Sequence, residues 1–275
     1  MALVVSPRLM HRLANPLTRR FTATALFGAL TGFKPPMPMS SAMDLPLDAA
    51  PQERYVFKPS YGSSHHWALG RLTGSVEGSR VLDIGAGGGG IGRSILPEGP
   101  SQLVAVEIDP RAQAGLRDTY GEVYASIEPL AGREFDTVVL LDVLEHMADP
   151  FGFLEQLERL IAPGGKILIS VPNVAHWSVR FSLLFGRFEY RSRGILDRTH
   201  LQFFSRRRFR QMCSSLPSCS IETMGASIEP VELVLPRWSV RNPLFAFMSR
   251  VRVGVAKLLP GLMAYQHLAV LRRDR

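Results

Sequence analysis

A carboxylate followed by a cluster of glycines is the feature of this sequence best suited to hold a small molecule. Asp83 stands two residues before the spacing Gly85-x-Gly87-x-x-Gly90, and the apolar residues around it read as a buried strand. A strand that runs into such a turn and then into a helix lets backbone approach a ligand, with helix N–H groups facing it. The spacing also satisfies the dinucleotide-binding fingerprint. A carboxylate beside the turn, however, repels a pyrophosphate and attracts a cation such as an amino acid's ammonium group.

A second carboxylate ends the next apolar run of the sequence. Glu107 follows Leu103–Val106, near the distance at which doubly wound folds place the acid that holds a ribose diol. Its two oxygens can accept hydrogen bonds from both ribose hydroxyls. Asp109 then reads as the N-cap of a helix that Pro110 opens. Together, the two acids predict a site for a positively charged nucleoside.

The residues from Val81 to Gly87 resemble motif I of the class I S-adenosylmethionine-dependent methyltransferases. The resemblance implies S-adenosylmethionine as the cofactor. Many members of the family place an acid after the third strand, against the adenine amino group, where this chain has Ser126. The residues that the resemblance assigns to the cofactor are Asp83, Gly85, Gly87, Glu107, Ser126 and Asp142.

The segment from Asp142 to His146 resembles the motif after the fourth strand in the ubiquinone-biosynthesis O-methyltransferases and their relatives. Ligands bind at the carboxyl ends of strands in an open parallel sheet, so we expect this motif near the pocket. His146 is a candidate general base because its ordinary pKa is close to neutral pH. The alternative is that His146 orders the cofactor loop. A Pro-Gly-Gly turn at 163–165 and the strand after it match the same family, and Asn173 beyond that strand is a candidate substrate contact.

Residues 194–204 resemble a signature of bacterial methyltransferases linked to cell-surface glycan and lipid-linked pathways. The run from Asp197 to His200 places four polar side chains in an apolar context, which is costly unless they are paired or used. Asp197 and Arg198 either pair with each other or with neighbours, or they contact the substrate, with Arg198 holding an acidic group. His200 is the second candidate base.

Strand-like runs alternate with helix-like segments from residue 80 onward, as a parallel sheet requires. The resemblance adds two final strands over 220–235 and 264–272, the last antiparallel and inserted between others. We therefore predict an α/β fold with a doubly wound, mostly parallel seven-stranded sheet of the Rossmann-like methyltransferase type. Within a domain over 44–275, we expect residues 174–204 to form an aromatic substrate-capping segment and residues 236–260 an amphipathic insertion.

Basic residues gather at the two ends of the chain. The net charge is +8, of which residues 1–43 carry +5 and residues 236–275 carry +7, which leaves −4 for the middle. A nucleic-acid-binding protein would carry its basic residues on the working face, so we expect no nucleic-acid partner. Cys213 and Cys219 lack zinc-site spacing, so no metal is predicted, and they read as reduced thiols of a cytoplasmic protein.

The first 43 residues are basic, free of acids, and contain a short apolar stretch that precedes three prolines. We interpret them as an N-terminal extension outside the fold, flexible or targeting. A mitochondrial transit peptide is one alternative, and a secretory signal is disfavoured because export would separate the enzyme from its cofactor. Over 243–259, apolar residues recur at helical spacing beside basic ones. This pattern suits either peripheral contact with an anionic membrane or packing on the domain itself.

These resemblances imply transfer of a methyl group from S-adenosylmethionine to a small-molecule, glycan or lipid-linked acceptor, at oxygen. The sulfonium carbon is already electrophilic, so the protein holds nucleophile and methyl group in line and removes a proton from a hydroxyl. Two alternatives remain open. One is an NAD(P)-dependent oxidoreductase of Rossmann type, against which Asp83 speaks, and the other is a non-catalytic cofactor-binding module on the same fold.

Overall fold

The computed structural model describes residues 57–231, 235, 240 and 242–274. Contacts divide the chain into two units, Met1–Met43 and Asp44–Arg275, and all described residues belong to the second. The predicted N-terminal extension therefore lies outside the described residues, as does part of the predicted insertion over 236–260.

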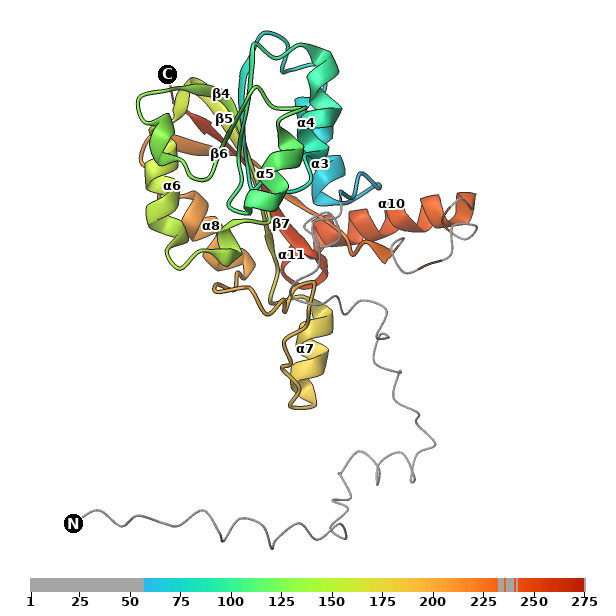
Figure 1. The fold of residues 1–275 in the computed structure, drawn as a ribbon. Coiled ribbons are helices and arrows are strands. Elements are labelled where there is room, and N and C mark those ends of the chain that lie inside the picture. The colour runs from blue at the N-terminus through green and yellow to red at the C-terminus, as the bar shows by residue number, and fades with distance from the viewer. Residues whose placement is uncertain (1–56, 232–234, 236–239, 241, 275) are drawn as a thin grey trace, which may run out of the picture. The chain divides into compact units, whose positions relative to one another are not determined.

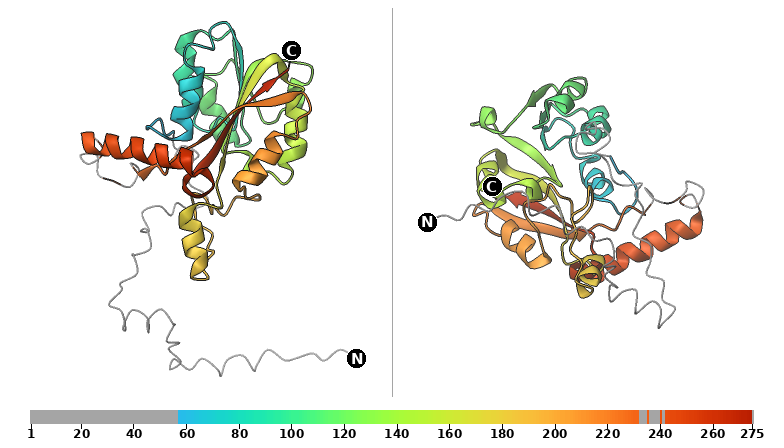
Figure 2. Two further views of the ribbon diagram at one scale, coloured as in Figure 1. Left: turned by 180° about the vertical axis from the view of Figure 1, so that it is seen from behind. Right: turned by 60° about the horizontal axis from the view of Figure 1, so that its bottom comes forward.

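A seven-stranded sheet forms the centre of the described structure, in the order β3-β2-β1-β4-β5-β7-β6 (Figures 1 and 2). Strands β1 to β5 run parallel, while β7 lies between β5 and β6 and runs antiparallel to both. This arrangement confirms the predicted mostly parallel sheet with an inserted antiparallel last strand. The strands are β1 Arg80–Ile84, β2 Gln102–Val106, β3 Glu122–Tyr124, β4 Phe135–Leu141, β5 Ile161–Pro172, β6 Cys219–Ala226 and β7 Gln266–Arg273.

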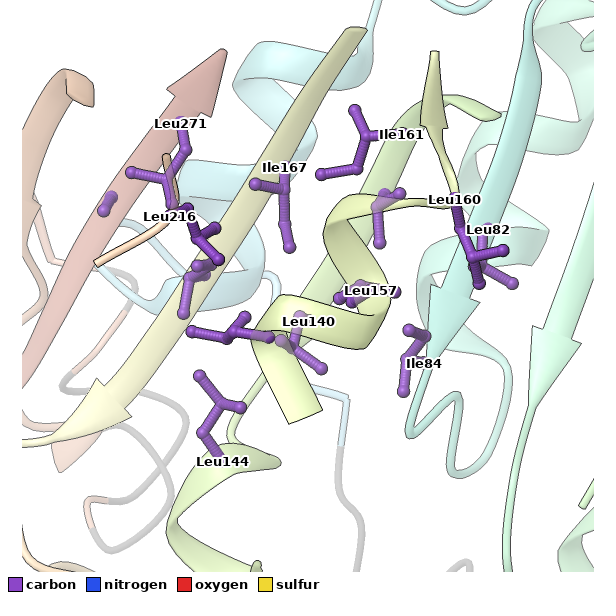
Figure 3. Close-up of a cluster of buried hydrophobic side chains, with 14 of the residues drawn as sticks. Leu82, Ile84, Leu140, Leu144, Leu157, Leu160, Ile161, Ile167, Leu216 and Leu271 are labelled. Atoms are coloured by element: carbon purple, nitrogen blue, oxygen red, sulfur yellow. The ribbon is translucent and has the colours of Figure 1, made fainter. Parts of the chain in front are cut away.

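Helices cover both faces of the sheet because its central strands are apolar on both sides. Val81 of β1 joins a buried cluster with Leu72 of α3 and Ile91 of α4. The next residue, Leu82, faces the opposite way and joins a cluster with Leu157 of α6 (Figure 3). The helices are α3 Ser64–Leu72, α4 Gly90–Ile95, α5 Pro110–Leu116, α6 Pro150–Glu158, α7 Trp177–Leu184, α8 Arg206–Cys213, α10 Pro243–Leu258 and α11 Pro260–Met263, and the 3-10 turns are η3 Leu96–Glu98, η4 Glu128–Leu130 and η5 Leu144–His146.

Two helices begin where the sequence predicts them. Asp109 caps α5, since its side chain accepts a hydrogen bond from the backbone N–H of Arg111 at 2.9 Å. Ser205 caps α8 in the same way, with the backbone N–H of Arg208 at 3.4 Å. Phe209 of α8 is fully buried, as its helical position predicts.

Strand β5 differs from the prediction, which starts it at Lys166 after the Pro-Gly-Gly turn. In the structure the strand begins at Ile161, and its pairing with β4 shifts between Phe135 and Thr137. Ile161 pairs with Phe135 and Lys166 with Thr137, so residues 163–165 bulge out of a strand that continues on both sides.

The strands β1, β2, β4 and β5 end along one edge of the sheet, here called the carboxyl edge, because they are parallel. Strand β7 begins at the same edge, since its Gln266 pairs with Pro172, the last residue of β5. Helix α7 follows β5 at this edge, and α10 and α11 precede β7 there. Strand β3 is parallel to β2 and ends at the same edge. The carboxyl edge therefore collects the loops after five strands and the entry to a sixth.

Helix α10 leaves exposed the apolar stripe that the sequence predicts for this segment. Of its residues only Ser249, Val253 and Ala256 are buried. Phe247 and Leu258 are 58% and 78% exposed. Packing on the domain thus accounts for one narrow face of the helix. No helix within the described part of the chain is long and apolar enough to span a bilayer.

Candidate functional site

The turn after β1 contains glycines in the left-handed backbone region. The φ angles are 71° at Gly85, 52° at Gly87 and 72° at Gly89, values that residues with side chains rarely adopt. At Gly85 an added Cβ would also lie 2.4 Å from Cγ2 of Val143, in the loop after β4. The turn therefore requires glycine, and its backbone lies close to the neighbouring loop.

Asp83 lies on β1 just before this turn and is 4% exposed. Its Oδ2 accepts a hydrogen bond from the hydroxyl of Tyr120, whose oxygen in turn accepts from the backbone N–H of Gly92 at 3.1 Å. Burial raises the pKa of Asp83 to about 6; the Tyr120 hydrogen bond opposes this rise, and the charge of Glu107 adds to it. The protein thus holds a carboxylate whose ionised form a nearby cation would stabilise.

Glu107 follows β2 directly and is also buried. Its Oε2 accepts a hydrogen bond from the backbone N–H of Gly87 at 2.8 Å, and its Oε1 accepts from that of Asp109 at 3.0 Å. Glu107 therefore links the glycine turn to the end of the next strand. Each oxygen keeps a lone pair after these bonds, so ribose hydroxyls can still donate to it.

Asp142 follows β4 with a φ of 57°, a left-handed value that is uncommon for a residue other than glycine. Its Oδ1 accepts from Ser170 Oγ at 2.6 Å, and both of its oxygens accept from Gln266 Nε2 at 2.7 Å. Gln266 is held in turn by Ser227, whose Oγ donates to the Gln266 Oε1 at 2.7 Å. Strained backbone persists only where its surroundings fix it, and here β5 and β7 do so.

Glu145, His146 and His200 meet at the carboxyl edge, from η5 and from the loop before α8. One oxygen or nitrogen of each lies within 4.8 Å of those of the other two. The Nδ1 of His146 is 3.2 Å from the Thr199 carbonyl oxygen, and that of His200 is 3.0 Å from the Ile195 carbonyl oxygen. A carbonyl oxygen only accepts, so Nδ1 donates in both rings and Nε2 is left as the acceptor.

The carboxylate of this cluster is the more unusual group. Glu145 is 1% exposed, and neither of its oxygens has a hydrogen-bond partner in the described structure. Burial raises the pKa of Glu145 well above its ordinary value, and burial lowers the pKa of His200, which favours the neutral imidazole. Such a cluster can take up a proton, and one carboxylate with two imidazoles is also a ligand set that suits a divalent cation. The sequence predicts no metal site, and these groups come together only in the fold.

Two further predicted site residues follow β3 and β5. Ser126 is exposed in the loop after β3, where its side chain bonds that of Glu128. Asn173 is fully buried. Its Nδ2 donates to the Ala264 carbonyl oxygen at 2.8 Å, and its Oδ1 accepts from the Ala175 N–H at 3.0 Å. Asn173 therefore supports the chain between β5 and β7, and its role as a substrate contact stays a prediction.

Pairing with a neighbour, one of the alternatives that the sequence leaves open for Asp197 and Arg198, is observed for Asp197. The Asp197 Oδ1 accepts from the backbone N–H of Thr199 at 2.8 Å and from its Oγ1 at 2.6 Å, so this carboxylate is paired with a neighbour. Arg198 has an exposed side chain beside it. The turn held by Asp197 carries His200 to the cluster with His146.

Sequence reasoning missed Tyr120 and Gln266. Tyr120 lies between α5 and β3 and reaches Asp83 only through the packing of α4 and α5 on the sheet. Gln266 reaches Asp142 because β7 runs antiparallel beside β5. A polar residue at the start of an otherwise apolar strand was the available signal for Gln266, and no local pattern marked Tyr120.

Three acids, Asp83, Glu107 and Asp142, thus lie after or at the ends of β1, β2 and β4. The side chains that hydrogen-bond Asp83 and Asp142 are the neutral Tyr120, Ser170 and Gln266. A cation fits this set of acceptors, while a pyrophosphate would be repelled. S-adenosylmethionine carries a sulfonium, an ammonium group and a ribose, and the residues present fit all three.

Comparison with known proteins agrees with this chemistry. A family model described as a methyltransferase domain matches residues 65–216, more than half of the chain. The chain is 34% identical over 106 residues to the ubiquinone biosynthesis O-methyltransferase of Cereibacter sphaeroides (strain ATCC 17029), covering 35% of this chain and 42% of that protein. It is 33% identical over 135 residues to that of Xanthomonas oryzae pv. oryzae (strain PXO99A), covering 46% and 55%. The chain spans about half the length of the curated relatives it matches.

Solved structures share the fold at low sequence identity. An S-adenosylmethionine-dependent methyltransferase from Mesorhizobium loti superposes with a TM-score of 0.52 at 16% identity, covering 77% of this chain and 99% of that one. A protein from Haloferax volcanii solved with the methyltransferase activator Trm112 gives 0.53 at 18% identity, covering 77% and 89%. These likenesses support the predicted sheet topology.

The buried charge of Asp83 predicts that Asp83→Asn stabilises the protein at pH 8, by about 1–3 kcal/mol. The pKa of Asp83 is about 6 in the folded protein, whereas the ordinary pKa of an aspartate side chain is 3.8. Its ionisation therefore costs stability above pH 6, and this cost disappears as the pH falls toward 4. Thermal unfolding of both proteins across this range measures the difference.

Asp136→Asn is the matched control for Asp83→Asn. The hydrogen bond from Arg80 lowers the pKa of Asp136, so this variant is expected to lose stability at pH 8 instead. A gain for Asp83→Asn that was as large at pH 4.5 as at pH 8, or no gain at pH 8, would contradict the assignment.

Proposed function

Because this chain belongs to the class I S-adenosylmethionine-dependent methyltransferases, we propose that it transfers the cofactor's methyl group to a hydroxyl of a small-molecule, glycan or lipid-linked acceptor. Its likeness to ubiquinone biosynthesis O-methyltransferases supports oxygen as the accepting atom. The proposal includes a cytoplasmic protein that contacts a membrane surface through residues 243–259. Nucleic acid is not among the proposed partners, because residues 44–235 carry a net charge of −4.

One observation carries this proposal: two buried acids at neighbouring strand ends flank a left-handed glycine turn. Asp83 neutralises the cofactor's ammonium group, and Glu107 accepts hydrogen bonds from the ribose hydroxyls. Gly85 and Gly87 let the backbone approach the amino-acid part of the cofactor. Asp83 speaks against the NAD(P)-dependent alternative, because its carboxylate would face the pyrophosphate of a dinucleotide.

The remaining cofactor contacts come from the loops after β3 and β4. Ser126 accepts one hydrogen bond from the adenine amino group, the role that an acid takes in many relatives. Asp142 lies at the end of β4, fixed by Ser170 and Gln266, and borders the pocket.

The bound cofactor supplies a methyl group that is electrophilic because it is attached to a sulfonium. The residues of this chain orient the acceptor and remove its proton. His146 and His200 are the proposed bases, since each has its Nε2 free to accept a proton. Glu145 lies beside both rings and, in its ionised form, stabilises the imidazolium that forms. Arg198 binds an acidic group of the acceptor, on the turn that Asp197 holds.

Glu107→Gln is expected to weaken binding of S-adenosylhomocysteine by about 10- to 100-fold, because it removes charged hydrogen bonds to the ribose. Calorimetric titration measures this affinity. Glu155→Gln, an exposed change on α6, serves as the control and leaves it unaltered. Unchanged affinity in Glu107→Gln, or tight binding of NAD by the wild type, would contradict the cofactor assignment.

His146→Ala and His200→Ala are each expected to slow methyl transfer by about 10²- to 10⁴-fold, with the affinity for S-adenosylhomocysteine unchanged. The assay follows labelled methyl groups from the cofactor into the aqueous and lipid fractions of a bacterial extract. Transfer to neither fraction would favour a non-catalytic binding module.

Treatment with a chelator shows whether the cluster of Glu145, His146 and His200 acts as a base or binds a metal ion. As proton acceptors, the two histidines need no metal, so the transfer rate stays constant after dialysis against EDTA. A loss that added Mg²⁺ or Mn²⁺ restores would assign Glu145, His146 and His200 to a metal ion instead.

A further inference from the structure

We propose that α7 and α10 together form a surface that lies on an anionic lipid bilayer and turns the carboxyl edge toward it, so that the methyl acceptor is an amphiphile drawn from the membrane. We call these two helices, with Phe185 after α7, the bilayer-facing surface. The choice of acceptor rests on the proposed function, whereas the membrane contact itself does not. The inference rests on four observations. The apolar side chains of α7 and α10 are exposed, both helices are basic, Glu229 links them, and both lie next to the carboxyl edge.

The first observation is an apolar stripe along the whole of α10 that points away from the domain. Its buried residues, Ser249, Val253 and Ala256, occupy the opposite side of the helix. The exposed apolar side chains recur at intervals of three and four residues, which places them on one face. They are Leu244, Phe247, Met248, Val251 and Leu258.

Helix α7 adds a second set of exposed apolar side chains. Phe181 is 49% and Leu184 77% exposed, and Trp177 and Phe185 are exposed as well. Val179 is the residue of this helix that is buried. Monomeric soluble proteins rarely expose apolar patches of this extent without a partner for them, and tryptophan is favoured at membrane–water boundaries.

Charge identifies the partner as an anionic surface. Neither α7 nor α10 contains an acid, while Arg180, Arg250 and Lys257 lie on them. Arg250 and Lys257 are exposed beside the apolar stripe of α10. An apolar face bordered by basic residues lies in the boundary between acyl chains and anionic headgroups. The absence of a spanning helix in the described residues fits a helix that lies on the bilayer.

Glu229 holds the two helices in one fixed relation. Its Oε2 accepts from Arg252 of α10 at 2.6 Å, and its Oε1 accepts from the indole N–H of Trp177 of α7 at 3.2 Å. The same oxygen lies 3.0 Å from Nε2 of His176, the N-cap of α7. Burial opposes ionisation of Glu229, yet its contacts with His176 and Arg252 outweigh burial and lower its pKa to about 2. The cluster therefore stays charged at neutral pH.

The bilayer-facing surface lies next to the candidate site in the fold. Helix α7 follows β5, and α10 and α11 precede β7, so both helices join the carboxyl edge (Figure 1). Gln266, the first residue of β7, is hydrogen-bonded to Asp142. Arg180 of α7 reaches the carbonyl oxygen of Gly261 in α11 at 3.2 Å. A protein resting on both helices therefore presents its site to molecules held in the membrane.

Flotation of the full-length protein with vesicles tests the membrane contact independently of methyl transfer. Vesicles of phosphatidylcholine with phosphatidylglycerol are compared with vesicles of phosphatidylcholine alone at physiological ionic strength. Arg250→Glu/Lys257→Glu on α10 is expected to weaken partition to the anionic vesicles at least about tenfold. Phe247→Glu/Leu258→Glu and Phe181→Glu/Phe185→Glu are expected to weaken it on both vesicle types.

Matched controls exclude a general effect of charge, including that of the basic residues 1–43, which every variant retains. Arg207→Glu/Arg210→Glu makes the same change in net charge on the exposed side of α8, and Leu96→Glu removes an exposed leucine of η3. Both controls are expected to partition as the wild type does. Calorimetry with S-adenosylhomocysteine verifies that every variant is folded and that the cofactor site is unaffected.

Three results would overturn the bilayer-facing surface, and with it the membrane contact of residues 243–259, while leaving the proposed methyl transfer standing. One is cofactor binding without any vesicle binding by the wild type. Another is equal loss of partition in the control variants. The third is a wild-type dimer in gel filtration that the α7 or α10 variants convert to a monomer, since a second copy of the chain would then cover the surface. Labelled methyl groups that enter only water-soluble acceptors would overturn the assignment of an amphiphilic acceptor.

Discussion

Two acids buried on neighbouring strands are the constraint around which the site is built. Asp83 and Glu107 are each about nine-tenths or more removed from water, and the charge of Glu107 makes ionisation of Asp83 harder. Burying carboxylates without cations costs free energy. The fold offsets part of this cost with the Tyr120 hydroxyl and with backbone N–H groups at Gly87 and Asp109. A positively charged ligand would remove the rest of this cost when it binds. The free energy that the buried carboxylates cost the ligand-free protein would then add to the affinity for that ligand.

The inserted strand β7 has a second role besides completing the sheet. It separates β5 from β6 and brings Gln266 to the carboxyl edge, where this side chain bonds both oxygens of Asp142. Asp142 in turn precedes the loop that carries Val143 against Gly85 and His146 toward His200. The left-handed turn at Asp142 thus connects the proposed cofactor pocket with the histidine cluster, and β7 holds that connection in place.

Features of the structure that depend on a few adjacent residues could be predicted from the sequence. Asp109 and Ser205 were found as helix caps because capping chemistry depends on a few adjacent residues. The mostly parallel sheet followed from alternating strand-like and helix-like segments, and its inserted antiparallel last strand from the family resemblance. The glycine turn needed no tertiary information either, since its positive φ angles restrict the residue type. The ligand roles given to Asp83, Glu107 and the histidines remain predictions.

Long-range partners could not be predicted in the same way. Tyr120 meets Asp83, and His200 meets His146, through packing of elements far apart in the sequence. The backbone partners of Asn173 likewise come from the fold, because its Nδ2 donates to the carbonyl oxygen of Ala264, about ninety residues along the chain. The stripe on α10 was visible in the sequence, but only the fold revealed that so little of it is buried.

The position of β7 also sets the order in which the molecule can be completed during synthesis. Strands β1 to β5 can pair as soon as they leave the ribosome, since each parallel neighbour has been made by then. The turn at Asp142 still lacks its amide partner at that stage, because Gln266 is translated well over a hundred residues later. The side chain that bonds both oxygens of Asp142 is therefore among the last parts of the site to be made, long after Asp83 and Glu107.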